Sequence, residues 1–284
     1  MLKRKLILGD EWIYVKIYTG QMFADKLLVT HWFPLVRQFL VKKLICEFFF
    51  LRYIDADGFH LRFRFLVSSS TDIGYVINMI NLKFNKLTKD NLITRVVYDT
   101  YNREFERYGE KYYIDTENLF FIDSLYTLNL LSHIQTITNM RWMCAIALID
   151  DTLNSFGYSI ADKAKYANWC KNLFRSEFNI VDKGIVHAID AKYRENKLLI
   201  DQSVKLLLPD NCKNEILSRR HAIIVILNKY NSEAQILCDE FISDFNHMTI
   251  NRFFISENRK CEWILYEYLS KYYDSEIARN KFLN

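Results

Sequence analysis

A row of arginines on a predicted β-strand is the feature of this sequence with the clearest chemical potential. In the segment His60-Leu61-Arg62-Phe63-Arg64-Phe65, polar and apolar residues alternate strictly. Successive side chains of a strand point to opposite faces, so His60, Arg62 and Arg64 are expected on one face. Guanidinium groups stay charged and bind carboxylate or phosphate through two hydrogen bonds. The pattern predicts an anion-binding face, with an ordinary amphipathic strand as the alternative.

The stretch before this strand predicts its hairpin partner. Phe48, Phe50 and Arg52 alternate in the same way, which adds Arg52 to the candidate cations. The turn-forming residues Asp55-Ala56-Asp57-Gly58 lie between the two runs. We therefore expect a β-hairpin with one apolar face and one cationic face.

The bulk composition restricts the classes of fold and function. With 284 residues and a hydrophobic share of 50%, the chain can bury a sizeable core, in one large domain or two modest ones. The 7 glycines and 2 prolines are too few for long linkers, low-complexity tails or Gly-rich phosphate loops. The formal net charge of +4 is too small to mark a nucleic-acid-binding protein. No direct nucleic-acid partner is expected.

The cysteines and the apolar runs predict the compartment. The six cysteines include no C-x-x-C pair and no histidine at metal-ligand spacing, so we expect free thiols, a reducing environment and no metal site. The N-terminal apolar run of three residues is too short for a signal peptide. No window reaches the roughly 18 apolar residues of a membrane span. A cytoplasmic protein is therefore expected.

Hydrophobic periodicity predicts a sheet followed by helices. Residues 12–18 indicate a first strand, and 93–104 return to strand-like alternation. Helices are expected at 22–43, with Pro34 as a kink or break, and at 71–84. Further helices are expected at 117–132, 138–156, 160–174, 186–202, 213–229, 232–247 and 257–273.

These elements indicate an α+β fold. We expect an antiparallel or mixed sheet packed with helices in residues 1–115 and a mostly helical part in 116–284. No Pro/Gly-rich boundary separates the two parts, so a single domain over 1–284 is predicted.

Three motifs carry a resemblance to a known family. They are Trp12, Tyr14, Lys16 and Tyr18 followed by FFFLRYIDADGFHLRFRF at 48–65, then DTYNREFERYG at 99–109 with Glu117 and FIDS at 121–124, and finally HMTINR at 247–252. Over residues 12–275 the sequence resembles the glutamate-elimination domain of lantibiotic dehydratases, which also occurs alone in thiopeptide pathways. One position departs from the family: Glu110 follows Gly109 where a second glycine is usual, which makes the turn less permissive.

The resemblance implies a reaction on a peptide. In this family, serine and threonine hydroxyls of a precursor peptide carry a glutamyl ester, and the domain expels glutamate to leave dehydroalanine or dehydrobutyrine. A separate enzyme that uses glutamyl-tRNA makes the ester. The expected partners are therefore the glutamylated precursor peptide and that enzyme, and a homodimer is left open.

The resemblance also implies two sets of site residues. Catalysis would fall on Arg64, Arg107 and His247, and the substrate-binding set is Arg52, Arg62, Glu104 and Arg252. Arginines can bind the glutamyl carboxylates and offset charge on the leaving oxygen, and a histidine can transfer a proton near neutral pH. This chemistry requires no metal or organic cofactor, and none is expected.

Other interpretations remain open for these residues and for the function. Arg107 and Glu104 are three residues apart, which is also the spacing of a surface ion pair. The alternative for His247 is a residue that caps a helix end. The alternative for Arg252 is a solvated charge at a helix junction. Relatives of the family join two dehydroalanines by formal [4+2] cycloaddition, and this chain could also be a non-catalytic subunit that binds peptide or partner. Retention of the arginines and Glu104 favours elimination, because cycloaddition involves no glutamyl carboxylate.

Overall fold

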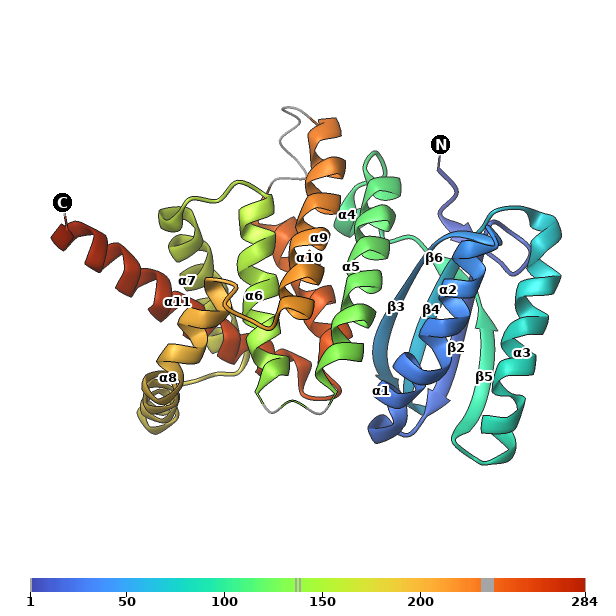
Figure 1. Ribbon diagram of the computed structural model, residues 1–284, viewed down its shortest axis with the longest axis horizontal. Helices are drawn as coiled ribbons and strands as arrows, with labels where there is room; N and C mark the ends of the chain where they lie inside the picture. Colours follow the sequence, from blue (N-terminus) through green and yellow to red (C-terminus); the bar gives the residue numbers. More distant parts are fainter. Residues whose placement is uncertain (1, 136, 138, 231–237, 284) are drawn as a thin grey trace. The chain divides into compact units, whose positions relative to one another are not determined.

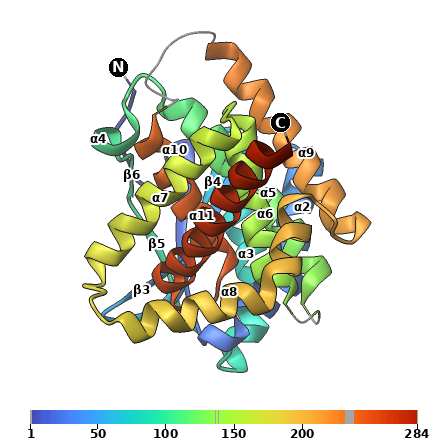
Figure 2. The ribbon, with the colours of Figure 1, turned by 90° about the vertical axis from the view of Figure 1, so that its left-hand side faces the viewer.

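A four-stranded antiparallel sheet carries the predicted arginine face. The computed structural model describes residues 2–135, 137, 139–230 and 238–283, shown in two views in Figures 1 and 2. The strands of the larger sheet are β3 (Ile45–Asp55), β4 (Gly58–Val67), β2 (Trp12–Thr19) and β5 (Ile93–Asp99), in that order. A smaller antiparallel sheet pairs β1 (Lys5–Leu6) with β6 (Tyr101–Asn102). With the helices described below, this confirms the α+β prediction.

The chain divides into two compact units. The N-terminal unit comprises residues 1–132 and the C-terminal unit residues 133–284. The first contains both sheets, and the second is built of helices. The single domain over 1–284 stays a prediction.

The hairpin of β3 and β4 has the predicted turn and register. Asp55 pairs with Gly58, so Ala56 and Asp57 form a two-residue connection. Gly58 has a φ of 115°, which a residue without a Cβ adopts readily. Arg64 lies opposite Phe49 on β3 and opposite Tyr14 on β2. This register places the arginines of β4 on one face and its phenylalanines on the other.

Helices cover the apolar face of this sheet. They are η1 (Gln21–Phe23), α1 (Ala24–Lys26), η2 (Leu27–Trp32), α2 (Phe33–Val41) and α3 (Ile73–Lys89), seen beside the sheet in Figure 1. The ring of Trp32 lies 3.7 Å from that of Phe63 on β4 and 5.2 Å from that of Phe84 on α3. Aromatic packing therefore joins both helical layers to the strand that carries Arg64.

The helical segment does not break at Pro34. Phe33 donates its backbone N–H to the carbonyl of Leu28, five residues back, so a π turn comes directly before the proline. Proline lacks an N–H, and its ring crowds the preceding helical turn. The wider π turn accommodates this crowding, and Pro34 falls in the first turn of α2, where no N–H is needed.

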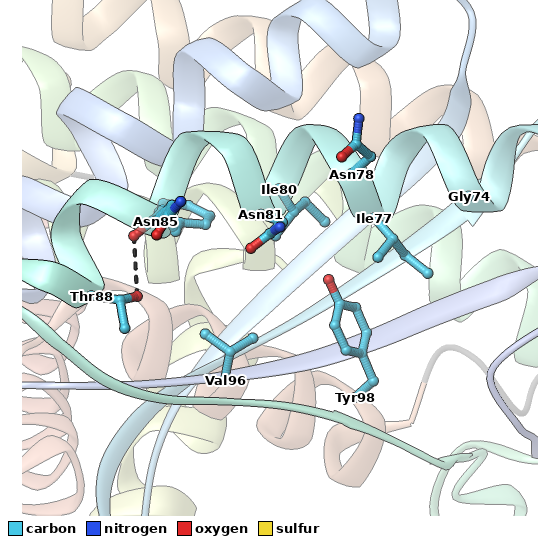
Figure 3. A pocket seen from close by; sticks show the side chains of 10 residues that line it. Gly74, Ile77, Asn78, Ile80, Asn81, Asn85, Thr88, Val96 and Tyr98 are labelled. Atoms are coloured by element: carbon cyan, nitrogen blue, oxygen red, sulfur yellow. Dashed lines mark hydrogen bonds between the residues drawn. The ribbon is translucent and has the colours of Figure 1, made fainter.

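The two edges of the larger sheet are bordered differently. Beside β3, Ser124 of α5 (Tyr113–Ile134) accepts a hydrogen bond from the N–H of Phe50. Beside β5, a groove of about 380 Å³ separates the strand from α3. Figure 3 shows Val96 and Tyr98 directed from β5 toward the asparagines of α3. None of the predicted site residues lines this groove.

The C-terminal unit is a bundle around a buried helix. Its helices are α6 (Met140–Ser155), α7 (Ile160–Glu177), α8 (Lys183–Val204), α9 (Asp210–Leu227), η4 (Asn228–Tyr230), α10 (Asp239–Phe253) and α11 (Asn258–Leu283). Helix α6 is buried from Met143 to Leu153 and packs against α8, α9 and α10. Figure 2 shows α11 running along α7. Of the helix predicted at 232–247, residues 232–237 lie outside the described part.

A buried polar cluster joins three helices of this bundle. Lys163 of α7 lies 2.7 Å from Oδ1 of Asp150 on α6, and the hydroxyl of Tyr273 on α11 donates to the same oxygen at 2.8 Å. Asp150 and Lys163 are both nearly inaccessible to solvent. Buried charges must be paired and hydrogen-bonded, so the cluster fixes how these three helices meet.

Candidate functional site

Arg64 is almost entirely enclosed by aromatic rings. Only 9% of the residue is exposed. Its Cζ lies 4.4 Å from the ring centre of Tyr14, 4.9 Å from that of Tyr101 and 5.0 Å from that of Phe49. Cation–π attraction contributes about 0.5–2 kcal/mol per contact and holds the guanidinium in place.

In the part of the chain that the structure describes, no carboxylate forms an ion pair with this guanidinium. Within the described residues, Nε and Nη1 of Arg64 have no hydrogen-bond partner, and the side chain takes part in no ion pair. A buried charge without a counter-ion costs several kcal/mol, which the aromatic rings offset only in part. The forked guanidinium is therefore well suited to receive an anionic group from outside the chain.

Arg62 precedes Arg64 by two residues on β4, so it lies on the same face of the sheet. Its Nε donates to Nε2 of His60 at 3.0 Å, and its Cζ lies 3.3 Å above the ring of Tyr53. The other ring nitrogen of His60 faces the carbonyl of Gly58 at 3.2 Å. Burial, reinforced by the charge of Arg62, lowers the pKa of His60. His60 thus positions Arg62 as a neutral imidazole.

A lysine adds a third cation to this face. Lys16 of β2 lies opposite Arg62 and forms an ion pair of 2.5 Å with Asp99. Burial raises the pKa of Asp99, but the hydrogen bonds from Lys16 and from the N–H of Thr100 outweigh this effect, so the pKa lies below its usual value. Asp99 is therefore a carboxylate of the cationic face whose charge is already paired with Lys16.

Glu47 brings an unusual carboxyl group to the same face of β3. It lies two residues from Phe49, which is the partner of Arg64. Burial and the nearby carboxylates of Glu117 and Asp115 raise its pKa to about 7. Glu47 therefore changes its protonation state close to neutral pH.

Tyr101 connects the arginine face to α5. Its hydroxyl donates to Glu117 at 2.8 Å, and Glu117 also binds Arg103 through two hydrogen bonds of 2.8 Å. The neighbouring hydroxyl of Tyr113 accepts the backbone N–H of Glu104 at 2.9 Å. These contacts fix the Tyr101 ring against Arg64 and hold the start of the segment that contains Glu104.

Arg107 lies on the short helix α4 (Phe105–Tyr108). It is 3.7 Å from Glu104, and its Cζ lies 5.4 Å from the ring centre of Tyr108. A third of the Arg107 side chain and 60% of the Glu104 side chain are exposed. Such an exposed pair contributes little to stability.

Arg52 lies on the opposite face of the sheet from Arg62 and Arg64. It is opposite Leu61, within the apolar set of β4, and its Nη2 binds Asp25 of α1 at 2.6 Å. The Arg52 side chain is 1% exposed. Arg52 is separated from Phe48 and Phe50 by an even number of residues, so all three side chains lie on the apolar face. The ion pair with Asp25 links β3 to the helices that cover this face.

His247 lies on α10 and forms a close pair with Glu262 of α11. Its Nδ1 is 2.8 Å from Oε2 of Glu262, which is 1% exposed, whereas the His247 side chain is 23% exposed. Arg259 reaches the same carboxylate oxygen at 3.2 Å. The arrangement resembles the histidine–carboxylate pairs that transfer protons in enzymes.

Arg252, one and a half turns beyond His247 on α10, is fully buried. It is a core residue of the bundle, and the alternative of a solvated charge is wrong. Arg62, Arg64, Glu104 and Arg107 thus belong to one connected region of the N-terminal unit, while His247 and Arg252 belong to the C-terminal unit.

Sequence reasoning missed several residues of these clusters. Glu262 lies in a charged stretch of a helix, where no pattern marks it as a partner of His247. Tyr101 and Glu117 stand within the motifs, but their contact depends on the approach of α5 to the smaller sheet. Glu47 precedes three phenylalanines, and only the packing of α5 explains its raised pKa.

Residues 12–273 match the model of the lantibiotic biosynthesis dehydratase C-terminal family. The chain belongs to that family. No curated protein sequence matches it.

Solved structures share the fold. The tRNA-dependent lantibiotic dehydratase MibB from Microbispora sp. 107891 is 18% identical with a TM-score of 0.75, and the match covers 98% of this chain and 29% of MibB. TsrL is 12% identical with a TM-score of 0.64, covering 94% of this chain and 95% of its own. The pyridine synthase TbtD from thiomuracin biosynthesis is 12% identical with a TM-score of 0.67, covering 94% and 99%. The chain therefore spans less than a third of MibB, but nearly all of the other two.

Two groups of functional features are absent from the described part of the chain. No cluster of three or more His, Cys, Asp or Glu residues there could hold a metal ion. Its helices include none that is long and apolar enough to cross a membrane.

Proposed function

We propose that this protein eliminates glutamate from glutamylated serine and threonine residues of a precursor peptide. In this step a base takes the α-proton, the Cβ–O bond breaks, and a Cα=Cβ double bond forms. The bonding electrons leave with the ester oxygen, so glutamate departs as a carboxylate. The products are dehydroalanine from serine and dehydrobutyrine from threonine.

The enclosed, unneutralised guanidinium of Arg64 carries this proposal. Elimination creates a carboxylate on the leaving group, and a fixed cation lowers the barrier most where charge develops. A single preorganised donor at such a position contributes about 10²–10³ in rate. Because Asp99 is paired with Lys16, Arg64 and Arg62 are available for the substrate carboxylates.

The other predicted residues receive complementary roles in this proposal. Arg107 binds a second carboxylate of the glutamyl group, and Glu104 accepts its ammonium. His247 transfers the α-proton, a contribution of typically about 10²–10⁴ in rate. Arg52 and Arg252 stabilise the two units rather than bind substrate, because both are buried away from the exposed charges.

The glutamylating activity is proposed to reside in a separate protein. MibB is named as a tRNA-dependent dehydratase, and this chain corresponds to 29% of it. In this proposal, which follows from the family resemblance, a partner that uses glutamyl-tRNA makes the ester on which this chain acts.

The test follows the fate of the glutamyl adducts. A precursor peptide is co-expressed with its glutamylating partner, purified with the adducts intact, and incubated with this protein. Mass spectrometry is expected to show loss of the adducts with one water-equivalent lost per site. Arg64→Ala, Arg107→Ala and His247→Ala should leave the adducts in place, with melting curves recorded to show that each variant is folded.

The second candidate function is formal [4+2] cycloaddition. The likeness to the pyridine synthase TbtD, which has almost the same extent as this chain, favours it. This function predicts that glutamyl adducts persist and that a peptide already containing dehydroalanines gains a ring. If instead the Arg64→Ala protein supports full dehydration, a non-catalytic subunit is the correct interpretation.

A further inference from the structure

The groove between α3 and β5 is lined by polar side chains whose hydrogen-bonding groups are unused. Asn78, Asn81 and Asn85 line it from α3, and Tyr98 lines it from β5 (Figure 3). Among the residues that the structure describes, these four side chains form no hydrogen bond with the protein. The groove volume of about 380 Å³ lies within the range of about 300–1,000 Å³ that is typical of ligand sites. The groove therefore has the size and the free polar groups of a binding site.

The three asparagines form a stripe along α3. Residues three and four apart lie on the same face of a helix, so positions 78, 81 and 85 follow one another along the groove. At about 1.5 Å of rise per residue the stripe is about 10 Å long, which is also the length of about three residues of extended chain. Each amide offers a donor and an acceptor, as each residue of a peptide backbone does. The stripe thus matches a short stretch of extended peptide.

The lining of the groove favours an uncharged segment. None of its described lining residues carries a charge, whereas Lys83, Lys86 and Lys89 of the same helix lie outside it. A charged side chain in the groove would lose hydration without gaining a counter-ion. Burial raises the pKa of Tyr98 to about 12, so its hydroxyl is protonated at neutral pH and can both donate and accept a hydrogen bond. Backbone amides and the hydroxyls of serine and threonine are suitable partners for this group.

We infer that this groove binds an extended, uncharged segment of the precursor peptide, rich in serine and threonine, that lies outside the residue being processed. The inference rests on the proposed elimination, in which such a peptide is the substrate. Asn78, Asn81 and Asn85 bind the peptide backbone, and Tyr98 binds a backbone or hydroxyl group from the opposite wall. These contacts are made by side chains, so no strand is added to β5.

The groove and the arginine face meet at β5. Successive side chains of a strand point to opposite faces, so Tyr98 lies in the groove while Asp99 lies on the arginine face, where it pairs with Lys16. Strand β2 lies between β5 and β4, so Arg64 on β4 is two strand spacings, or about 10 Å, from β5. All of these residues belong to the N-terminal unit. A peptide that crosses the edge of β5 can therefore reach both places with a few extended residues between them.

The experiment measures how the full chain binds the precursor peptide without glutamyl adducts, by fluorescence anisotropy of the labelled peptide. Asn81→Ala and Asn85→Ala should each weaken binding by about 3–10-fold, and the triple variant that also contains Asn78→Ala by about 30-fold or more. Tyr98→Phe removes only the hydroxyl and should weaken binding by about 3–10-fold. The matched control is Asn172→Ala, because Asn172 is an exposed asparagine of α7 without a hydrogen bond in the described part of the chain.

The variants are chosen so that unfolding does not obscure the result. Alanine favours a helix more than asparagine does at an exposed position, so the α3 variants are expected to fold. Tyr98→Phe tests the opposite wall of the groove independently. In the assay for loss of glutamyl adducts, the triple variant should raise KM for the peptide by about 30-fold or more, and the loss of rate should be recovered at saturating peptide.

Each outcome decides between the inference and its rivals. Unchanged peptide binding in the groove variants, an equal loss in Asn172→Ala, or no binding of the peptide by the parent protein overturns the inference. A change of self-association in light scattering with unchanged peptide binding identifies a second copy of the chain as the occupant, and this also overturns it. Weaker peptide binding in the groove variants of a protein that removes no glutamate supports the groove and overturns the elimination function instead.

Discussion

Glu47 makes the stability of this protein depend on pH in a defined direction. Its pKa is raised to about 7 in the folded chain, chiefly by burial and then by Glu117 and Asp115. An unfolded glutamate has a pKa near 4.5. Between these two values the folded state binds more protons than the unfolded state, so the free energy of unfolding falls as pH rises. Below about pH 4.5 the carboxyl is neutral in both states and has no effect.

The magnitude follows from the size of the shift. A difference of about 2.5 pKa units corresponds to roughly 3 kcal/mol at 1.36 kcal/mol per unit, and partial exposure of Glu47 reduces this to about 2–3 kcal/mol. Glu47→Gln removes the titration while keeping the shape of the side chain. The variant should therefore gain about 2–3 kcal/mol over the parent as pH rises from 4.5 to 8.

Urea unfolding of both proteins at a series of pH values measures this difference. Comparing the parent with Glu47→Gln at each pH cancels the titration of other buried carboxyls. Exposed Glu240 provides the control for loss of one negative charge, as Glu240→Gln. Parallel stability curves for the parent and Glu47→Gln between pH 4.5 and 8 would refute the reasoning.

Three further predictions concern the charged residues. Arg64→Lys should keep the charge but lose the bidentate geometry, so glutamate release should fall by about 10-fold or more, and Arg64→Ala by about 10²–10³-fold, in the mass-spectrometric assay. Lys163→Met should destabilise the protein by about 3 kcal/mol in urea unfolding, because it leaves the buried carboxylate of Asp150 without its cation; a change below about 1 kcal/mol would contradict this. Arg52→Gln should lower the melting temperature while leaving the KM for glutamylated peptide unchanged, and a raised KM with an unchanged melting temperature would return Arg52 to the substrate site.

The strands were predictable because their patterns are local. The alternation from His60 to Phe65 and the turn before it determine both the hairpin and the face that Arg64 occupies. The same parity rule applied to Arg52 gives it the face of Phe48 and Phe50, whereas the sequence analysis counted it among the substrate-binding cations. The charge of Arg52 suggested a substrate role, whereas its pairing with Asp25 comes from a helix 27 residues earlier in the chain.

Contacts between distant segments were out of reach of sequence patterns. The rings around Arg64 come from β2, β3 and β6, and only the register of the strands brings Tyr14, Phe49 and Tyr101 to one point. The pairing of His247 with Glu262 requires α10 and α11 to meet at one angle, which neither helix encodes by itself. The π turn before Pro34 was visible only as an irregularity, because a proline within a helix permits several local solutions.

The exposed edge of β5 affects the tendency of this protein to aggregate through pairing of its sheets. In the described part of the chain its outer side meets no further strand, and such borders invite pairing between molecules. Thr94 and Arg95 are exposed there, and Arg95 is tied to Asp57 at 2.8 Å. A bulky, hydrated charge in this position disfavours hydrogen bonding between β5 and a strand of another molecule. Replacing Arg95 with an aliphatic residue is therefore expected to lower the solubility of the protein at high concentration.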